Sequence, residues 1–240
     1  MNNPNSDIYE MLDTLSLPVA AQRFSELTQS PELVNYTAFQ FIREVLEPQY
    51  AETLNRRFET NLRLSSLINK GALTENLKTG NGLVYNDATV QQVLEFHFAE
   101  NRQNVGIYGV TGAGKSYFIS ACCVEACRRN YRCKFVDYSD LLDELIVLNR
   151  QKDLNRYRKR IKYYARMQRL FIDDFAISRY SEEGIKILYH LLKLRDDLGT
   201  STLLVVNIRQ MNGESNSVTR MNAMENWTVS GDALQQDLQF

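Results

Sequence analysis

The chain has 240 residues, enough for one α/β domain and a smaller unit. Hydrophobic residues make up 44% of it, which excludes global disorder, and the formal net charge of −1 excludes a polycation. Any nucleic-acid contact therefore requires a local basic patch. No apolar run reaches the roughly 18 residues of a membrane helix, and the N-terminus lacks the pattern of a secretory signal. We expect a cytoplasmic protein with no membrane partner.

The first third of the chain predicts helices. Apolar residues recur at helical spacing from Ile8 to Leu15 and from Ala38 to Leu46, and Pro18 and Pro48 are expected to interrupt them. A third helical segment is expected over residues 50–67. This helical N-terminal domain, residues 1–80, carries no pattern of catalytic residues, and packing or oligomerisation is its simplest role.

After a glycine-containing boundary near residue 80, apolar strands alternate with helical segments. Strands are expected over residues 104–109, 133–137, 170–173 and 202–206. Helices are expected over residues 90–99, 115–129, 141–148 and 185–194. This alternation favours a mainly parallel α/β sheet with helices on both faces, over residues 81–208.

A glycine-rich loop follows the first of these strands and fits GxxxxGK[ST] at every fixed position. Glycines allow backbone N–H groups to approach phosphate oxygens, and the following helix adds the positive end of its dipole. The lysine reaches the terminal phosphates and the serine hydroxyl binds Mg²⁺. The sequence therefore predicts a P-loop that binds ATP and Mg²⁺. Its residues are Gly109, Val110, Thr111, Gly112, Ala113, Gly114, Lys115 and Ser116.

Two carboxylates end the apolar strand that begins at Leu170. The carboxyl ends of parallel strands line the ligand crevice, so Asp173 is a candidate metal ligand. Asp174 is a candidate general base that activates water. A solvated Asp-Asp turn is the alternative, and the complete P-loop upstream makes it the weaker one.

Residues 149–169 contain nine Lys or Arg against one acid, Asp153, with tyrosines interleaved. Such a stretch suits a phosphate backbone. A solvated helix face is an equally good interpretation. The candidate DNA-binding residues are Arg156, Arg158, Lys159 and Arg160.

Four cysteines lie within twelve residues of one another, from Cys122 to Cys133. No CxxC pair and no nearby histidine accompanies them, which makes a zinc site a poor interpretation. Buried free thiols are expected instead.

The helical N-terminal unit, the P-loop segment from Val105 to Ser116 and the segment from Leu170 to Phe175 together resemble the IstB-like ATPases. These proteins assist insertion-sequence transposition and are related to DnaC-type helicase loaders. The resemblance implies an AAA+ ATPase that forms a homo-oligomer on duplex DNA and partners the transposase of the same element. It also implies that Asn207, which ends the last expected strand, acts as a sensor in catalysis.

The chain departs from the family pattern after residue 208. Residues 209–240 are polar and aperiodic, without a recognisable arginine finger or final strand. We therefore expect a loosely packed or truncated tail, impaired hydrolysis and a first strand at the sheet edge.

Two other functions stay open. One is a helicase-loader adaptor, which this sequence does not separate from a transposition helper. The other is a P-loop small-molecule kinase, against which stand the helical N-terminus and the Asp-Asp pair.

Overall fold

The computed structural model describes residues 6–77, 87–109, 112–151, 153–175, 181–207 and 227–229. The chain forms two compact units, Met1–Glu59 and Thr60–Phe240. The domain boundaries expected at residues 80 and 208 fall outside the described residues and stay predictions.

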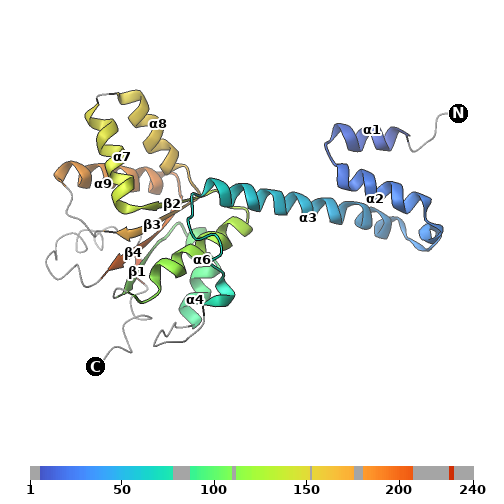
Figure 1. Cartoon of the computed structure of the whole chain (residues 1–240), viewed down its shortest axis with the longest axis horizontal. Coiled ribbons are helices and arrows are strands. Elements are labelled where there is room, and N and C mark those ends of the chain that lie inside the picture. Colours follow the sequence, from blue (N-terminus) through green and yellow to red (C-terminus); the bar gives the residue numbers. More distant parts are fainter. Residues whose placement is uncertain are drawn as a thin grey trace. The chain divides into compact units, whose positions relative to one another are not determined.

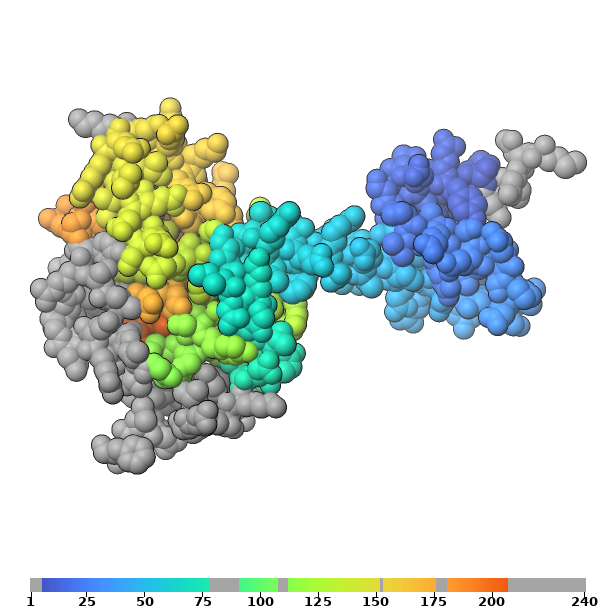
Figure 2. All heavy atoms as spheres, viewed as in Figure 1, coloured from blue at the N-terminus to red at the C-terminus, as the bar shows by residue number. Residues whose placement is uncertain are grey.

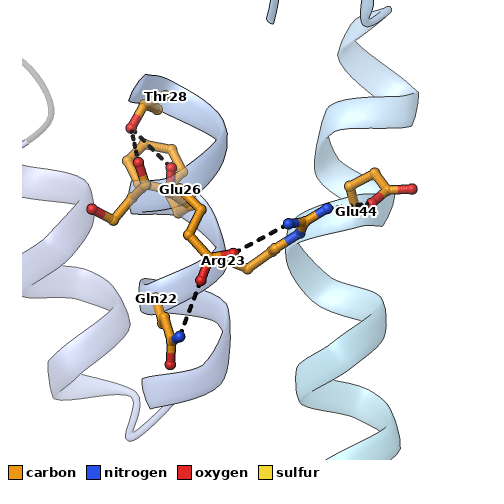
Figure 3. A network of polar contacts seen from close by, with 7 residues as sticks. Gln22, Arg23, Glu26, Thr28 and Glu44 are labelled. Atoms are coloured by element: carbon orange, nitrogen blue, oxygen red, sulfur yellow. Dashed lines mark hydrogen bonds and ion pairs between the residues drawn. The ribbon is translucent and has the colours of Figure 1, made fainter. Parts of the chain in front are cut away.

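The first unit consists of α1 (Ser6–Thr14), α2 (Pro18–Gln29), the 3-10 helix η1 (Pro31–Asn35) and the first part of α3 (Ala38–Leu64). Its small core contains Phe24 of α2 and Val45 of α3, with Ala20 and Leu27 around them. Beside this core, Arg23 pairs with Glu26 and Glu44, both at 3.1 Å, so that one guanidinium joins α2 to α3 (Figure 3).

The predicted interruption at Pro48 is wrong, because α3 continues through it. Proline lacks the N–H that would bond one turn back, so neighbouring contacts must hold the helix there. The buried side chain of Gln49 accepts hydrogen bonds from the backbone N–H of Val19 and Ala20 at 3.0 and 3.3 Å. With Val45 also buried, α3 is anchored to α2 on both sides of Pro48.

The second unit is built on a parallel five-stranded sheet of order β2-β3-β4-β1-β5 (Figure 1). Its strands are β1 (Asn104–Gly109), β2 (Cys133–Asp137), β3 (Arg169–Phe175), β4 (Ser201–Asn207) and β5 (Trp227–Val229). β3 and β4 are buried along most of their length, as expected for a sheet with helices on both faces. The predicted α/β fold and its four strands are confirmed.

Helices cover both faces of this sheet (Figure 1). α7 (Tyr138–Arg150), α8 (Leu154–Ala165) and α9 (Glu182–Asp197) enclose one core with Leu170, Ile172 and Leu204. α6 (Lys115–Arg128) packs on the opposite face and carries Cys122, Cys123 and Cys127, whereas Cys133 begins β2. All four are buried free thiols, as predicted. The remaining helices are η2 (Thr74–Asn76), α4 (Asp87–Leu94) and α5 (His97–Glu100). A single helix predicted over residues 90–99 is instead broken at Phe96, a buried residue with φ of 59°.

The expectation of β1 at the sheet edge is wrong. β1 pairs with β4 on one side and with β5 on the other, with Asn104 opposite Trp227. Three residues of the segment expected to be a loosely packed tail, Trp227–Val229, therefore form a strand. Residues 209–226 and 230–240 lie outside the described part of the chain.

Arg195 of α9 is almost completely buried and joins three elements of this unit. Its guanidinium donates hydrogen bonds to carbonyls at the end of α8 and at the start of β4, and to the Thr202 hydroxyl. The acceptors are Tyr164 O, Ala165 O, Met167 O, Ser201 O and Thr202 Oγ1. Burial lowers its pKa to about 9, so this group remains cationic at neutral pH.

Candidate functional site

The predicted site residues meet at the carboxyl edge of the sheet. Because all strands are parallel, their carboxyl ends lie on one side, where ligands of such sheets bind. Gly109 at the end of β1 lies opposite Asn207 at the end of β4. Asp137 at the end of β2 lies opposite Asp173 of β3. The sheet register therefore gathers the start of the P-loop, the sensor candidate and the acidic pair at one edge.

The glycine loop turns into α6 through two left-handed residues. Gly112 has φ of 84° and Gly114, the residue before α6, has φ of 73°. An ideal Cβ on Gly112 meets no atom within 4 Å, so backbone conformation is what requires glycine there. Within the described residues, no side chain caps the N-terminus of α6, and such a helix end attracts an anion. Val110 and Thr111 lie outside the described residues, and Ala113 is half-buried between the two glycines.

Lys115 begins α6 and is buried. Burial lowers the pKa of its ammonium group, and the carboxylates of Asp173 and Asp174 oppose that shift. A lysine and two carboxylates from distant parts of the chain therefore act on one another at the end of the loop.

Ser116 and Asp173 are in direct contact. The Ser116 hydroxyl donates a hydrogen bond of 3.3 Å to Asp173 Oδ1. One turn later, Ser120 Oγ donates to the Ser116 carbonyl at 2.6 Å. The two oxygens of the predicted metal site thus come from a helix, α6, and a strand, β3. Both are hard oxygen ligands, the kind that Mg²⁺ prefers.

Asp174 sits in a strained position. Its φ is 51°, and the β3–β4 register shifts between Ile172 and Phe175, which marks a bulge. Bulges re-aim side chains and occur beside active sites. The backbone N–H of Asp174 donates to Asp173 Oδ1 at 2.9 Å, so the bulge fixes the orientation of the Asp173 carboxylate.

The surroundings of Asp174 make it a stronger base than an ordinary aspartate. Burial raises its pKa, the charges of Asp173 and Asp137 raise it further, and Lys115 lowers it. Sequence reasoning missed Asp137. Its position at the end of a predicted strand was the available signal, because parallel strands bring their carboxyl ends together.

The structure divides the four DNA-binding candidates, all on α8. Arg158 and Lys159 are exposed. Arg156 is exposed too, but its Nε lies 3.4 Å from Asp153 Oδ2. Arg160 is half-buried and lies 2.6 Å from Glu144 of α7. Arg160 is therefore engaged in an ion pair with a neighbouring helix, whereas the exposed face of α8 keeps the cationic character seen in the sequence.

The family model of the IstB-like ATP binding protein matches residues 10–216 of the chain. The chain belongs to this family. The IstB-like family thus accounts for both the helical unit and the P-loop unit, and it makes this chain an ATP-binding protein of the P-loop class.

Curated relatives carry the names of insertion sequences. An inferred ATP-binding protein of insertion sequence IS5376 from Geobacillus stearothermophilus is 23% identical over 188 residues, 78% of this chain and 73% of that protein. Its counterpart from insertion sequence IS232 of Bacillus thuringiensis subsp. berliner is 30% identical over 121 residues. That match covers 49% of this chain and 47% of the relative, so this IstB-like chain spans about half of the second protein.

Solved structures with the same fold include replication proteins. AMPPCP-bound DnaA from Aquifex aeolicus aligns with a TM-score of 0.53 and 21% identity, over 68% of this chain and 51% of that chain. DnaI aligns with a TM-score of 0.50 and 18% identity, over 70% and 88%. These similarities show that the second unit has the AAA+ type of P-loop fold. Among the described residues, no helix is both long and apolar enough to cross a bilayer.

Proposed function

We propose that this IstB-like protein is a Mg²⁺-dependent ATPase that assembles as a homo-oligomer on duplex DNA and assists the transposase of its own insertion sequence. The observation that carries the enzymatic part is the contact of Ser116 with Asp173, formed where Lys115 and Asp174 act on the same carboxylate. The names of the relatives support the transposition context.

Each residue has a distinct role in this proposal. The N–H groups around Gly112 and Gly114 and the Lys115 ammonium hold the nucleotide phosphates. The Ser116 hydroxyl and the Asp173 carboxylate, 3.3 Å apart, fit one Mg²⁺, which supplies positive charge opposite the phosphates when bound. Asp174 accepts a proton from the attacking water, and its raised pKa favours that step. Asn207, at the end of β4, acts as the sensor residue in catalysis.

Substitution of each aspartate by Asn, assayed by the rate of ATP hydrolysis, tests these assignments. Asn is suitable because it fits the backbone at both positions, including the positive φ of Asp174. Asp174→Asn is expected to lower DNA-stimulated ATP turnover about 10²-fold and to leave nucleotide affinity intact. Asp173→Asn is expected to weaken Mg²⁺-dependent nucleotide binding. Asp143→Asn, an exposed position on α7, is the matched control.

Turnover that survives Asp174→Asn, or nucleotide binding lost in that variant alone, contradicts the assignment. The partner is tested by size-exclusion chromatography with the transposase of the same element and duplex DNA. A complex with a replicative helicase in place of the transposase would assign the protein to helicase loading.

A further inference from the structure

The N-terminal end of α7 is fixed to the nucleotide-site edge of the sheet. Asp137 lies beside Asp173 in the β2–β3 register. Its carboxylate caps α7 by accepting hydrogen bonds from the N–H of Ser139 at 2.7 Å and of Asp140 at 3.3 Å. Since the first N–H groups of a helix need such acceptors, α7 begins at a point set by the strand next to Asp173.

A second contact joins α7 to the bulge of β3. The rings of Tyr138, the first residue of α7, and Phe175, which directly follows Asp174, lie with centroids 4.5 Å apart. Both residues are buried in the core between the sheet and α7–α9. Because protein interiors are close-packed, a displacement of the bulge is passed to the start of α7.

About two turns further along, α7 is clamped to α8. Glu144 accepts a hydrogen bond from the Tyr164 hydroxyl at 2.6 Å and pairs with Arg160 at 2.6 Å. The Arg160 guanidinium also lies over the rings of Tyr163 and Tyr164, at 5.1 and 5.2 Å. Figure 2 shows α7 and α8 as one continuous surface, yellow-green to yellow, on the second unit.

We propose that α7 couples nucleotide occupancy to the position of α8, and that Glu144 is the positioning residue of this coupling. The inference rests on the proposed function, with the exposed cations of α8, Arg158 and Lys159, taken as its DNA contacts and with Asp173 and Asp174 responding to nucleotide. A helix is stiff, so a shift of its capped end moves Glu144 and with it Arg160. Coupling of two binding sites is reciprocal, so DNA on α8 changes nucleotide affinity by the same factor.

Hydrogen exchange of the full-length protein tests the coupling without requiring DNA. Saturating AMPPCP with Mg²⁺, with occupancy verified by calorimetry, is expected to change amide exchange in α8 of the wild type at least threefold. Glu144→Ala is expected to abolish that change in α8 while keeping nucleotide affinity within twofold. Tyr164→Phe, which removes only the hydroxyl bond, is the milder variant should Glu144→Ala fail to fold.

The matched control is Glu183→Ala. It breaks the 2.9 Å ion pair with Arg150 that joins the other end of α7 to α9, so it removes a comparable contact outside the connection described above. This variant is expected to keep the nucleotide-dependent change in α8. Loss of the change in both variants would overturn the assignment to Glu144.

Duplex-DNA affinity, measured with and without AMPPCP and Mg²⁺, separates the inference from the proposed function. The ratio of the two affinities is expected to fall at least threefold in Glu144→Ala. Unchanged α8 exchange in nucleotide-saturated wild type, or an equal change in Glu144→Ala, overturns the coupling. A nucleotide-dependent change in α8 without any duplex-DNA binding would uphold the coupling and contradict the proposed function.

Discussion

At the residue scale, Lys115 shows how burial shapes the candidate site. Its ammonium group is largely removed from water, and this burial disfavours the charged form. The carboxylates of Asp173 and Asp174 compensate part of the lost stabilisation of that charge. A phosphate chain offers the same compensation with more negative charge. The side chain is therefore arranged to gain from an anionic ligand beyond what a solvated lysine would gain.

Lys115→Ala is accordingly expected to weaken ATP binding at least tenfold, about 1.4 kcal/mol, because it removes a partly desolvated charge that faces the phosphates. Isothermal calorimetry with Mg²⁺ and a non-hydrolysable analogue measures this directly. Lys134→Ala is the control, since Lys134 is also a partly buried lysine but lies on β2, where it contacts Ser66. Equal losses in both variants would show that general destabilisation, and not phosphate recognition, causes the effect.

The placement of single residues at this edge of the sheet was predictable from the sequence where a motif fixes it. The P-loop spacing identified Lys115 and Ser116, and the apolar strand identified Asp173. The bulge at Asp174 was not predictable, because register between distant strands decides it. Asp137 was missed for the same reason: its charge matters only because β2 lies next to β3.

At the element scale, the structure divides the cations of α8 that the proposal assigns to DNA binding into exposed and paired residues. Arg158 and Lys159 are exposed, and Arg160 is held by Glu144. The four predicted cations thus include exposed side chains and one, Arg160, that is paired with a neighbouring helix. Charge counting along the sequence could not separate them, since the partner Glu144 belongs to another helix.

The double substitution Arg158→Ala and Lys159→Ala is expected to weaken duplex-DNA binding and to flatten the slope of log K against log salt. The expected change in slope is about 0.9 for each phosphate that the variant no longer neutralises. Fluorescence anisotropy over a salt series measures the slope. Lys193→Ala, an exposed cation of α9, is the control and should leave the slope unchanged. A slope unaltered in the double variant would assign this face of α8 to simple solvation.

The helical N-terminus shows the limit of local rules for elements. Proline was expected to end a helix at Pro48, and tertiary contacts from Gln49 and Val45 overrode that preference. At Pro18 the same rule succeeded, because proline there opens α2, where its missing N–H costs nothing.

At the scale of the whole molecule, the buried Arg195 links α9 to α8 and β4 within the α/β unit. Its guanidinium donates to carbonyls at the end of α8 and at the start of β4, and so ties three elements together through one buried side chain. Helical spacing places this arginine in line with the buried Leu188, Leu191 and Leu192. Its position on the buried face of α9, among leucines, was the signal in the sequence.

Arg195→Met is expected to lower the free energy of unfolding by about 3 kcal/mol or more, because five acceptors, most of them buried, lose a charged donor at once. Urea denaturation measures the change. Lys193→Met, an exposed position two residues away on the same helix, should alter stability by less than about 0.5 kcal/mol. A near-neutral Arg195→Met would mean that water can enter and satisfy those carbonyls.

The class of fold was predictable because alternation of strands and helices is a local pattern that leaves few arrangements. The fifth strand was not, because its three residues carry no periodicity of their own and are identified only by pairing with β1. The expectation that β1 lies at the edge of the sheet was wrong for that reason.

The position of β1 between β4 and β5 has a consequence for synthesis on the ribosome. Both neighbours of β1 lie C-terminal to it, and β4 begins only at Ser201. While residues before Ser201 are emerging, β2 and β3 can already pair, but the strand that leads into the P-loop has no partner. Contacts between distant segments form slowly, and unpaired apolar strands invite misassembly. The nucleotide site is therefore assembled last, and a nascent chain arrested before Ser201 would fail to bind ATP even though every P-loop residue had been made.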